Sequence, residues 1–144
     1  MTDTSVKTPV HLWIIGIVAL LWNAMGAFDY TATQLRLESY MAAFTPEQLA
    51  YFNGFPAWAK GFWAIAVWSS VLGSIALLMR KSWAVMLFGI SIVGLVGTSI
   101  YNFVLTDGLA QMGEGAGIFS VLIWVISIFL FFYARAMVAK KVLY

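Results

Sequence analysis

Four long apolar segments constrain the fold of this chain more than any other feature. They cover approximately residues 11–29, 57–79, 82–105 and 117–138. Each has about 19–24 residues, enough for a helix to cross roughly 30 Å of hydrocarbon at 1.5 Å per residue. The length of the first apolar run favours a membrane span over a cleaved signal peptide. The segments therefore predict four transmembrane helices.

The composition supports this interpretation. Apolar residues make up 62% of the chain and charged residues only 10%, whereas a soluble domain has about a quarter of its residues charged. The surface must therefore face lipid, and seven Trp and six Tyr fit the aromatic belts of a bilayer. We predict an all-α membrane protein, a four-transmembrane-helix bundle that forms one integral-membrane domain over residues 1–144.

The segment between the first two spans is neither apolar nor featureless. Thr45 can cap a helix, Pro46 suits the first helical position, and Gln48 can close a capping box. A helix over residues 46–52 is expected. Residues 35–44 mix apolar and charged side chains, which predicts an amphipathic helical segment at the interface or continuing the first span. The glycine-rich loop from Thr106 to Gly117 is expected to be mobile.

The basic residues predict the orientation. With four spans, both termini and the turn at residues 80–81 share one side of the membrane. Six of the eight basic residues fall on that side: Lys7, Arg80, Lys81, Arg135, Lys140 and Lys141. The other two, Arg36 and Lys60, fall on the opposite side. The positive-inside rule then predicts a multi-pass protein of the bacterial inner membrane with cytoplasmic N- and C-termini.

Polar residues in the outer halves of the spans indicate a candidate pocket. In the first span, Asn23, Tyr30 and Gln34 fall on one stripe of a helix, and Asp29 falls on the neighbouring stripe. A buried amide such as Asn23 is costly in hydrocarbon unless it faces the bundle. Lys60 and Trp63 share a stripe of the second span. The predicted ligand-binding residues are Asn23, Asp29, Tyr30, Gln34, Lys60, Trp63, Tyr101 and Asn102.

Structural explanations compete with this pocket. The Lys60 ammonium can extend to the interface, and Asp29 can be a solvated helix end; these polar groups can also contact another subunit. In the pocket hypothesis, Asp29 or another acid pairs with Lys60. The small and hydroxyl residues of the spans, such as Ser70 and Ser91, are interpreted as helix-packing positions.

Catalytic and cofactor signatures are missing from the sequence. There is one His, His11, interpreted as an interface anchor, and there is no Cys. No carboxylate or His cluster has metal-ligand spacing. The glycine-rich run at residues 113–117 lacks the Lys of a phosphate loop. We expect no enzymatic activity, no cofactor and no metal. A net charge of +2 without a basic run argues against nucleic-acid binding.

One set of motifs carries a resemblance. These are Trp22-Asn23, Asp29-Tyr30 and Thr33-Gln34 of the first span, then Thr45-Pro46-Glu47-Gln48 and Phe55-Pro56-Ala57-Trp58. This pattern resembles a group of uncharacterised small four-helix proteobacterial membrane proteins, which are often labelled "sugar transporter". The similarity runs from the first span to the third. The label implies little about the substrate.

Two functional hypotheses follow. In the first, the protein binds a small polar or amphiphilic ligand through an outward-facing polar pocket. In an extended form of this hypothesis, it also transports that ligand. In the second, it is an accessory or structural subunit of a membrane protein complex. Four helices cannot easily enclose an alternating-access pathway, so transport implies at least a dimer. The expected partners are the lipid bilayer and further copies of the chain or a larger membrane complex.

Overall fold

The computed structural model describes residues 7–35, 38–42, 44–106 and 114–144. Within these ranges every regular element is a helix, and the predicted all-α, four-helix membrane fold is confirmed. Four helical stretches are long and apolar enough to cross a bilayer. They are α1 (Val10–Leu35), α4 (Ala57–Leu78), α5 (Ala84–Ser99) with its π-helical continuation η2 (Ile100–Leu105), and α7 (Glu114–Ala139).

Two short helices, α2 (Glu38–Met41) and α3 (Pro46–Asn53), connect α1 to α4. The capping prediction for α3 is confirmed. The backbone N–H of Thr45 donates to Gln48 Oε1 at 3.1 Å, and the N–H of Gln48 donates to Thr45 Oγ1 at 3.2 Å. This reciprocal pair satisfies two N–H groups that a helix start leaves without intrahelical partners.

The helix ends differ from the predicted spans in two places. Helix α1 continues to Leu35, past the predicted end at residue 29, because the polar turn after Asp29 contains neither Pro nor a glycine pair to stop it. Helix α7 begins at Glu114, so the predicted loop up to Gly117 is wrong at its C-terminal end. The predicted mobility concerns residues 107–113, which lie outside the described part of the chain.

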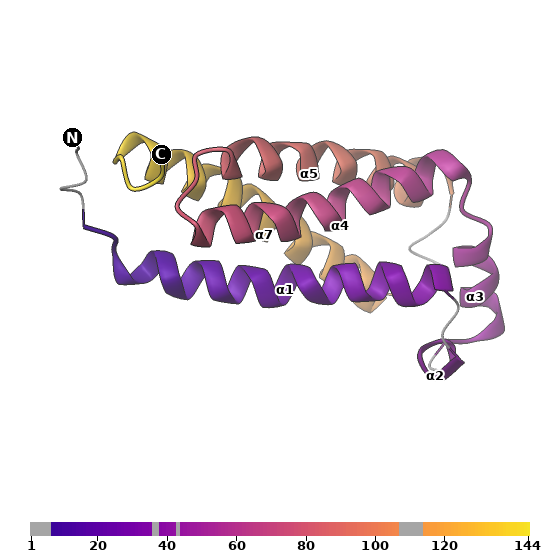
Figure 1. Cartoon of the computed structure of the whole chain (residues 1–144). Coiled ribbons are helices and arrows are strands. Elements are labelled where there is room, and N and C mark those ends of the chain that lie inside the picture. The colour runs from indigo at the N-terminus through magenta and orange to yellow at the C-terminus, as the bar shows by residue number, and fades with distance from the viewer. Residues whose placement is uncertain (1–6, 36–37, 43, 107–113) are drawn as a thin grey trace.

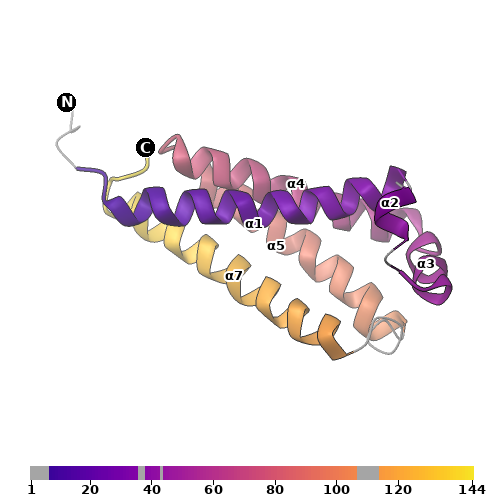
Figure 2. The ribbon, with the colours of Figure 1, turned by 90° about the horizontal axis from the view of Figure 1, so that it is seen from below.

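The four long helices form a bundle that is packed at one end and splayed at the other. The start of α1, the end of α7 and the α4–α5 turn lie together, and we call this the terminal end (Figure 1). Helix α3 lies at the opposite end, called here the α3 end. Helix α4 packs along both α1 and α5, and α7 packs along α5. Viewed from below, α7 diverges from α1 toward the α3 end (Figure 2).

A well-packed core closes the terminal end. Its buried members include Leu12 of α1, Leu77 of α4, Phe88 of α5 and Met137 of α7. The last residues of the chain fold back onto the α4–α5 turn and complete this core, and Leu143 is buried there. All four long helices are therefore fixed to one another at this end.

Backbone contacts anchor the tail, and one side-chain bond joins α1 to α7. The Tyr144 N–H donates to Arg80 O at 3.0 Å, and the Ser82 N–H donates to Tyr144 O at 3.0 Å. His11 Nδ1 forms a hydrogen bond with the Tyr133 hydroxyl. His11 thus contacts α7 at the start of α1, the boundary position at which the sequence predicted an anchor.

Small residues allow α4 and α5 to approach closely. A Cβ atom at Gly94 would lie 2.7 Å from the backbone nitrogen of Ala66 and 2.7 Å from the carbonyl oxygen of Phe62. These neighbours are backbone atoms, which cannot rotate away. One turn earlier on α5, Ser91 Oγ donates to Ala66 O at 2.7 Å, a bond that requires this short interhelical distance. The seam follows the small-residue packing expected in membranes.

The close approach predicts a position-specific cost of adding one methyl group. Gly94→Ala forces α4 and α5 apart and should destabilise the protein by about 1–3 kcal/mol. The matched control is Gly61→Ala in α4, where a Cβ meets nothing within 4 Å; this change should be neutral or slightly stabilising. Thermal melting in detergent measures both. Equal melting temperatures for the two variants would contradict the tight seam.

Candidate functional site

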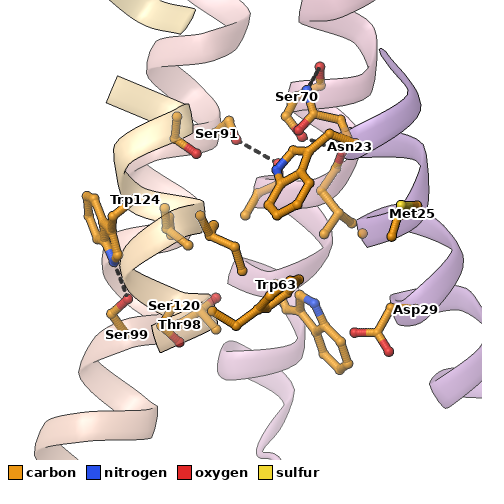
Figure 3. A pocket seen from close by; sticks show the side chains of 18 of the residues that line it. Asn23, Met25, Asp29, Trp63, Ser70, Ser91, Thr98, Ser99, Ser120 and Trp124 are labelled. Carbon is orange, nitrogen blue, oxygen red and sulfur yellow. Dashed lines mark hydrogen bonds between the residues drawn. The ribbon is translucent and has the colours of Figure 1, made fainter. Parts of the chain in front are cut away.

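The splay of α7 leaves a cavity of about 850 Å³ between the four long helices. It lies on the α3-end side of the core described above. Its wall on α1 runs from Leu21 to Asp29, about 12 Å along the helix axis at 1.5 Å per residue. Figure 3 shows Asn23 and Ser70 toward one end of the cavity and Asp29 and Trp63 toward the other.

Asn23 supplies the most deeply buried polar group of the α1 wall. Its side chain is 9% exposed. Its Nδ2 donates to the backbone carbonyl of Ser70 at 3.2 Å and to Ser74 Oγ at 2.8 Å. The Ser74 hydroxyl in turn donates to Ser70 O at 2.9 Å. Since a carbonyl only accepts, the nitrogen of the amide must face Ser70, and this fixes the orientation of the Asn23 side chain.

Hydroxyl groups of α4 and α5 continue the polar wall. Ser70 Oγ and Thr98 Oγ1 each donate to a carbonyl of their own helix, at 2.9 and 3.0 Å. Ser91 Oγ donates across the seam to Ala66 O at 2.7 Å (Figure 3). All three residues line the cavity. Each hydroxyl proton is thus directed to the backbone, and the oxygen lone pairs remain as acceptors.

Helix α7 closes the cavity with aromatic and hydroxyl side chains. Trp124 Nε1 donates to Ser99 Oγ at 3.0 Å, a bond that joins α7 to α5 (Figure 3). Ser120 and Ser127 line the same wall at helical spacing. This wall therefore combines an indole surface with hydroxyls that can donate or accept.

The cavity opens between α1 and α7 through an apolar rim. Leu21, Met25 and Phe28 line it, yet their side chains are 63%, 63% and 57% exposed. Beside the opening, α1 and α7 touch through the rings of Trp22 and Phe119, whose centroids lie 5.4 Å apart. Both helices are long and apolar enough to cross a bilayer, and the rim between them has the apolar composition expected of a surface in contact with hydrocarbon.

Helix α3 covers the cavity from the α3 end. The Tyr51 hydroxyl donates to Asn102 Oδ1 and lies 3.0 Å from Thr106 Oγ1. Asn102 belongs to η2, and Thr106 directly follows it. The wider turn of η2 is closed by the hydrogen bond from the Thr106 N–H to Tyr101 O at 3.0 Å. Such π-helical turns often mark functional positions in helices. Tyr51 thus fastens α3 to the end of the third span.

An aromatic cluster lies beside this cover. Phe55 and Tyr101 have ring centroids 4.6 Å apart, and Trp58 meets Tyr101 edge-on at 5.6 Å. Tyr30 of α1 meets Trp63 of α4 edge-on, with centroids 5.0 Å apart. These are favourable aromatic geometries, and they hold the α3 end of the bundle together where α7 has moved away.

The structure separates the eight predicted site residues into three groups. Four of them line the cavity: Asn23, Asp29, Trp63 and Asn102. Tyr30 and Tyr101 belong to the aromatic contacts beside it. Gln34 and Lys60 do not line it, because α1 extends past the cavity at Gln34 and the first turn of α4 lies beyond it.

The hypothesised pair between Asp29 and Lys60 is not formed. Both residues are described, and no ion pair joins them. Asp29 lies on the cavity wall, half-buried, whereas Lys60 lies in the first turn of α4, away from that wall. The sequence places both residues at similar depth, at the outer ends of the first two spans, but depth alone does not fix direction around the helix axis.

The sequence interpretation missed the contribution of the hydroxyl residues and of α7. The stripes containing Ser70, Ser91 and Ser127 were visible in the sequence and were assigned to packing. Ser91 does pack against α4, but all three also face the cavity. One feature of the sequence could have indicated the role of α7. Trp124 shares a stripe with Ser120 and Ser127, and its side chain is too large for a tight small-residue seam.

The described residues provide no metal site, since they contain no group of three or more His, Asp or Glu side chains placed to hold an ion.

No family model, no curated protein and no solved structure matches the chain. The physical properties of the cavity are therefore the basis for assigning a function.

The Tyr51 contact predicts an alkaline loss of stability. Burial raises the pKa of Tyr51 above its ordinary value of 10.0, the nearby Tyr101 raises it further, and the hydrogen bond with Thr106 partly opposes both. The folded protein therefore holds this proton more tightly than the unfolded chain does. The resulting stabilisation is complete below about pH 10 and is lost as the pH rises through the raised pKa.

Tyr51→Phe tests this sign. At pH 8 the variant should melt below wild type, because hydrogen bonds worth about 1 kcal/mol each are lost. Above pH 10 the gap should narrow, because only the wild type loses the Tyr51 proton. Tyr144→Phe, which removes a hydroxyl from a side chain that is 67% exposed at the terminal end, is the control and should keep the wild-type pH profile. A gap that stays constant from pH 8 to pH 11 would contradict the role of Tyr51.

Proposed function

We propose that the protein binds a small amphiphilic ligand that enters the cavity from the bilayer, between α1 and α7. The observation that carries this proposal is the contrast between the two sides of the cavity. Its rim is apolar and exposed at Leu21, Met25 and Phe28, while its inner wall carries the amide of Asn23 and a row of hydroxyls. An amphiphile matches both sides, because its polar group meets the inner wall and its apolar part meets the rim.

A fully polar solute fits this cavity less well. Much of the lining is aromatic or aliphatic, including Phe103, Phe119 and Ile123, and these side chains offer no hydrogen bonds to replace the water lost from a sugar or an ion. The opening also faces the hydrocarbon. Of the two ligand classes expected from the sequence, the amphiphilic one is therefore favoured over the polar one.

Binding is favoured over transport for a single chain. Transport needs a second opening on the terminal side of the ligand, where Leu12, Leu77 and Phe88 form a closed core. A transporting form would need at least two copies and a rearrangement of this core. The role of an accessory subunit, with a partner helix seated between α1 and α7, is the alternative that the ligand experiment below must exclude.

We place the terminal end in the cytoplasm of a bacterial cell and the α3 end on the outer side of its inner membrane. The basic side chains Arg80, Lys81, Arg135, Lys140 and Lys141 belong to the terminal end, and the positive-inside rule supports this orientation. In this orientation the cavity lies in the outer half of the bilayer.

The orientation is tested by reporter fusions. A phosphatase that is active only outside the cytoplasm should be inactive when fused after Tyr144, and a fluorescent protein that folds only in the cytoplasm should be bright there. When the same two reporters are inserted at Gly54, between α3 and α4, the phosphatase should be active and the fluorescent protein should be dark. A C-terminal fusion that is phosphatase-active would invert the proposed orientation.

Ligand binding is tested by filling the cavity. Ser127 lines it, and Ser127→Phe places a ring inside it. Photolabelling with a diazirine-bearing long-chain alcohol, followed by mass spectrometry of the peptides, should mark residues 21–29 in wild type and fall at least about fivefold in the variant. That loss corresponds to about 1 kcal/mol.

The control is Leu122→Phe, which adds a ring at a side chain of the same helix that is 45% exposed; it should leave the labelling of residues 21–29 unchanged. Two results would contradict binding at this cavity. In the first, the labelling of residues 21–29 is insensitive to Ser127→Phe. In the second, these residues stay unlabelled in wild type, as expected if a partner helix occupies the space between α1 and α7.

A further inference from the structure

We propose, building on the amphiphile-binding function above, that the cavity selects an uncharged ligand whose polar group is a hydrogen-bond donor, namely a membrane-soluble alcohol or phenol. The donor binds Asn23 Oδ1 at the inner end of the cavity. The hydrogen bonds around Asn23 indicate that the ligand group is a donor. The charge of the lining and the depth of the site indicate that this group is neutral.

The amide nitrogen of Asn23 is already engaged. It donates to the Ser70 carbonyl at 3.2 Å and to Ser74 Oγ at 2.8 Å. Its carbonyl oxygen, Oδ1, accepts no hydrogen bond from the described part of the chain. Among the described residues, Thr33 Oγ1 is the one fully buried side-chain oxygen or nitrogen without a partner. Asn23 Oδ1 also has no partner there, so it is not fully buried. Since the Asn23 side chain lines the cavity, its unused acceptor faces the open space.

The neighbouring hydroxyl groups, like Asn23 Oδ1, present hydrogen-bond acceptors to the cavity. Ser70 and Ser91 donate their hydroxyl protons to backbone carbonyls and can offer only lone pairs to a ligand. Thr98 behaves in the same way one step further along α5. An ether or a ketone brought to this wall would place acceptor against acceptor and leave Asn23 Oδ1 without a partner, which is costly in a buried site. A hydroxyl supplies the missing proton.

The ligand group at this wall must also be neutral. Among the described residues that line the cavity, Asp29 is the one charged side chain, and none of these lining residues is a cation that could bind a phosphate or carboxylate. Asn23 lies 13 residues after Val10, about 20 Å along the axis and thus beyond the middle of a 30 Å hydrocarbon layer. An ionised group is strongly disfavoured at that depth.

The experiment compares four probes that share one chain: 1-hexadecanol, hexadecyl methyl ether, hexadecylamine and hexadecyl phosphate. Each competes with the diazirine alcohol for residues 21–29 of the full-length protein in lipid nanodiscs. The alcohol should compete at about one-tenth of the ether concentration, the ratio that one buried neutral hydrogen bond supplies. The amine and the phosphate should be weaker competitors than the alcohol.

Asn23→Leu should reduce the preference for alcohol over ether from about tenfold to less than about twofold, while the ether still competes. Tyr144→Phe removes a hydroxyl at the terminal end, outside the cavity, and should keep the preference. If Asn23→Leu does not fold, the wild-type comparison decides alone. Equal competition by alcohol and ether, or stronger competition by the phosphate or the amine, overturns the donor assignment and leaves amphiphile binding intact. Labelling that no probe displaces overturns the proposed function itself.

Discussion

The close approach of α4 and α5 at Gly94 is the constraint on which the rest of the bundle depends. Backbone-to-backbone contact fixes the distance between these two helices, because no side chain there can yield. Helix α1 is then tied to the other face of α4 by the bonds of Asn23 to Ser70 and Ser74. Three helices are thus held by interactions that are stronger in hydrocarbon than apolar packing alone, since lipid competes for apolar contacts.

Helix α7 lacks such ties to α1 over most of its length. It meets α1 through His11 and Tyr133 at the terminal end and through the rings of Trp22 and Phe119 further along. Large side chains such as Phe119 and Trp124 hold it away from the small-residue seam, and the cavity is the space that remains. The same feature that weakens the packing of α7 therefore creates the opening between α1 and α7 through which we propose that the ligand enters.

The polar groups of the cavity serve structure and recognition together. Asn23 uses its amide nitrogen to join α1 to α4, while its oxygen accepts no hydrogen bond from the described residues. The hydroxyls of Ser70 and Ser91 donate to the helix backbone in the same way. Packing thus determines the hydrogen-bond polarity of the wall. A protein that holds its membrane helices together by donating protons presents acceptors to whatever enters between them.

Hydrophobic length and local hydrogen bonding are properties of short stretches of chain, so the four spans, the capped helix after Thr45 and the polar residues toward one end could be predicted without a structure. The cost of a buried amide likewise predicted that Asn23 faces the bundle. That Asn23, Asp29, Trp63 and Asn102 share a cavity, while Gln34 and Lys60 lie outside it, became visible in the folded chain alone. The tilt of α7 and the rotation of each helix depend on packing between residues far apart in the chain, and no periodicity within one span encodes them.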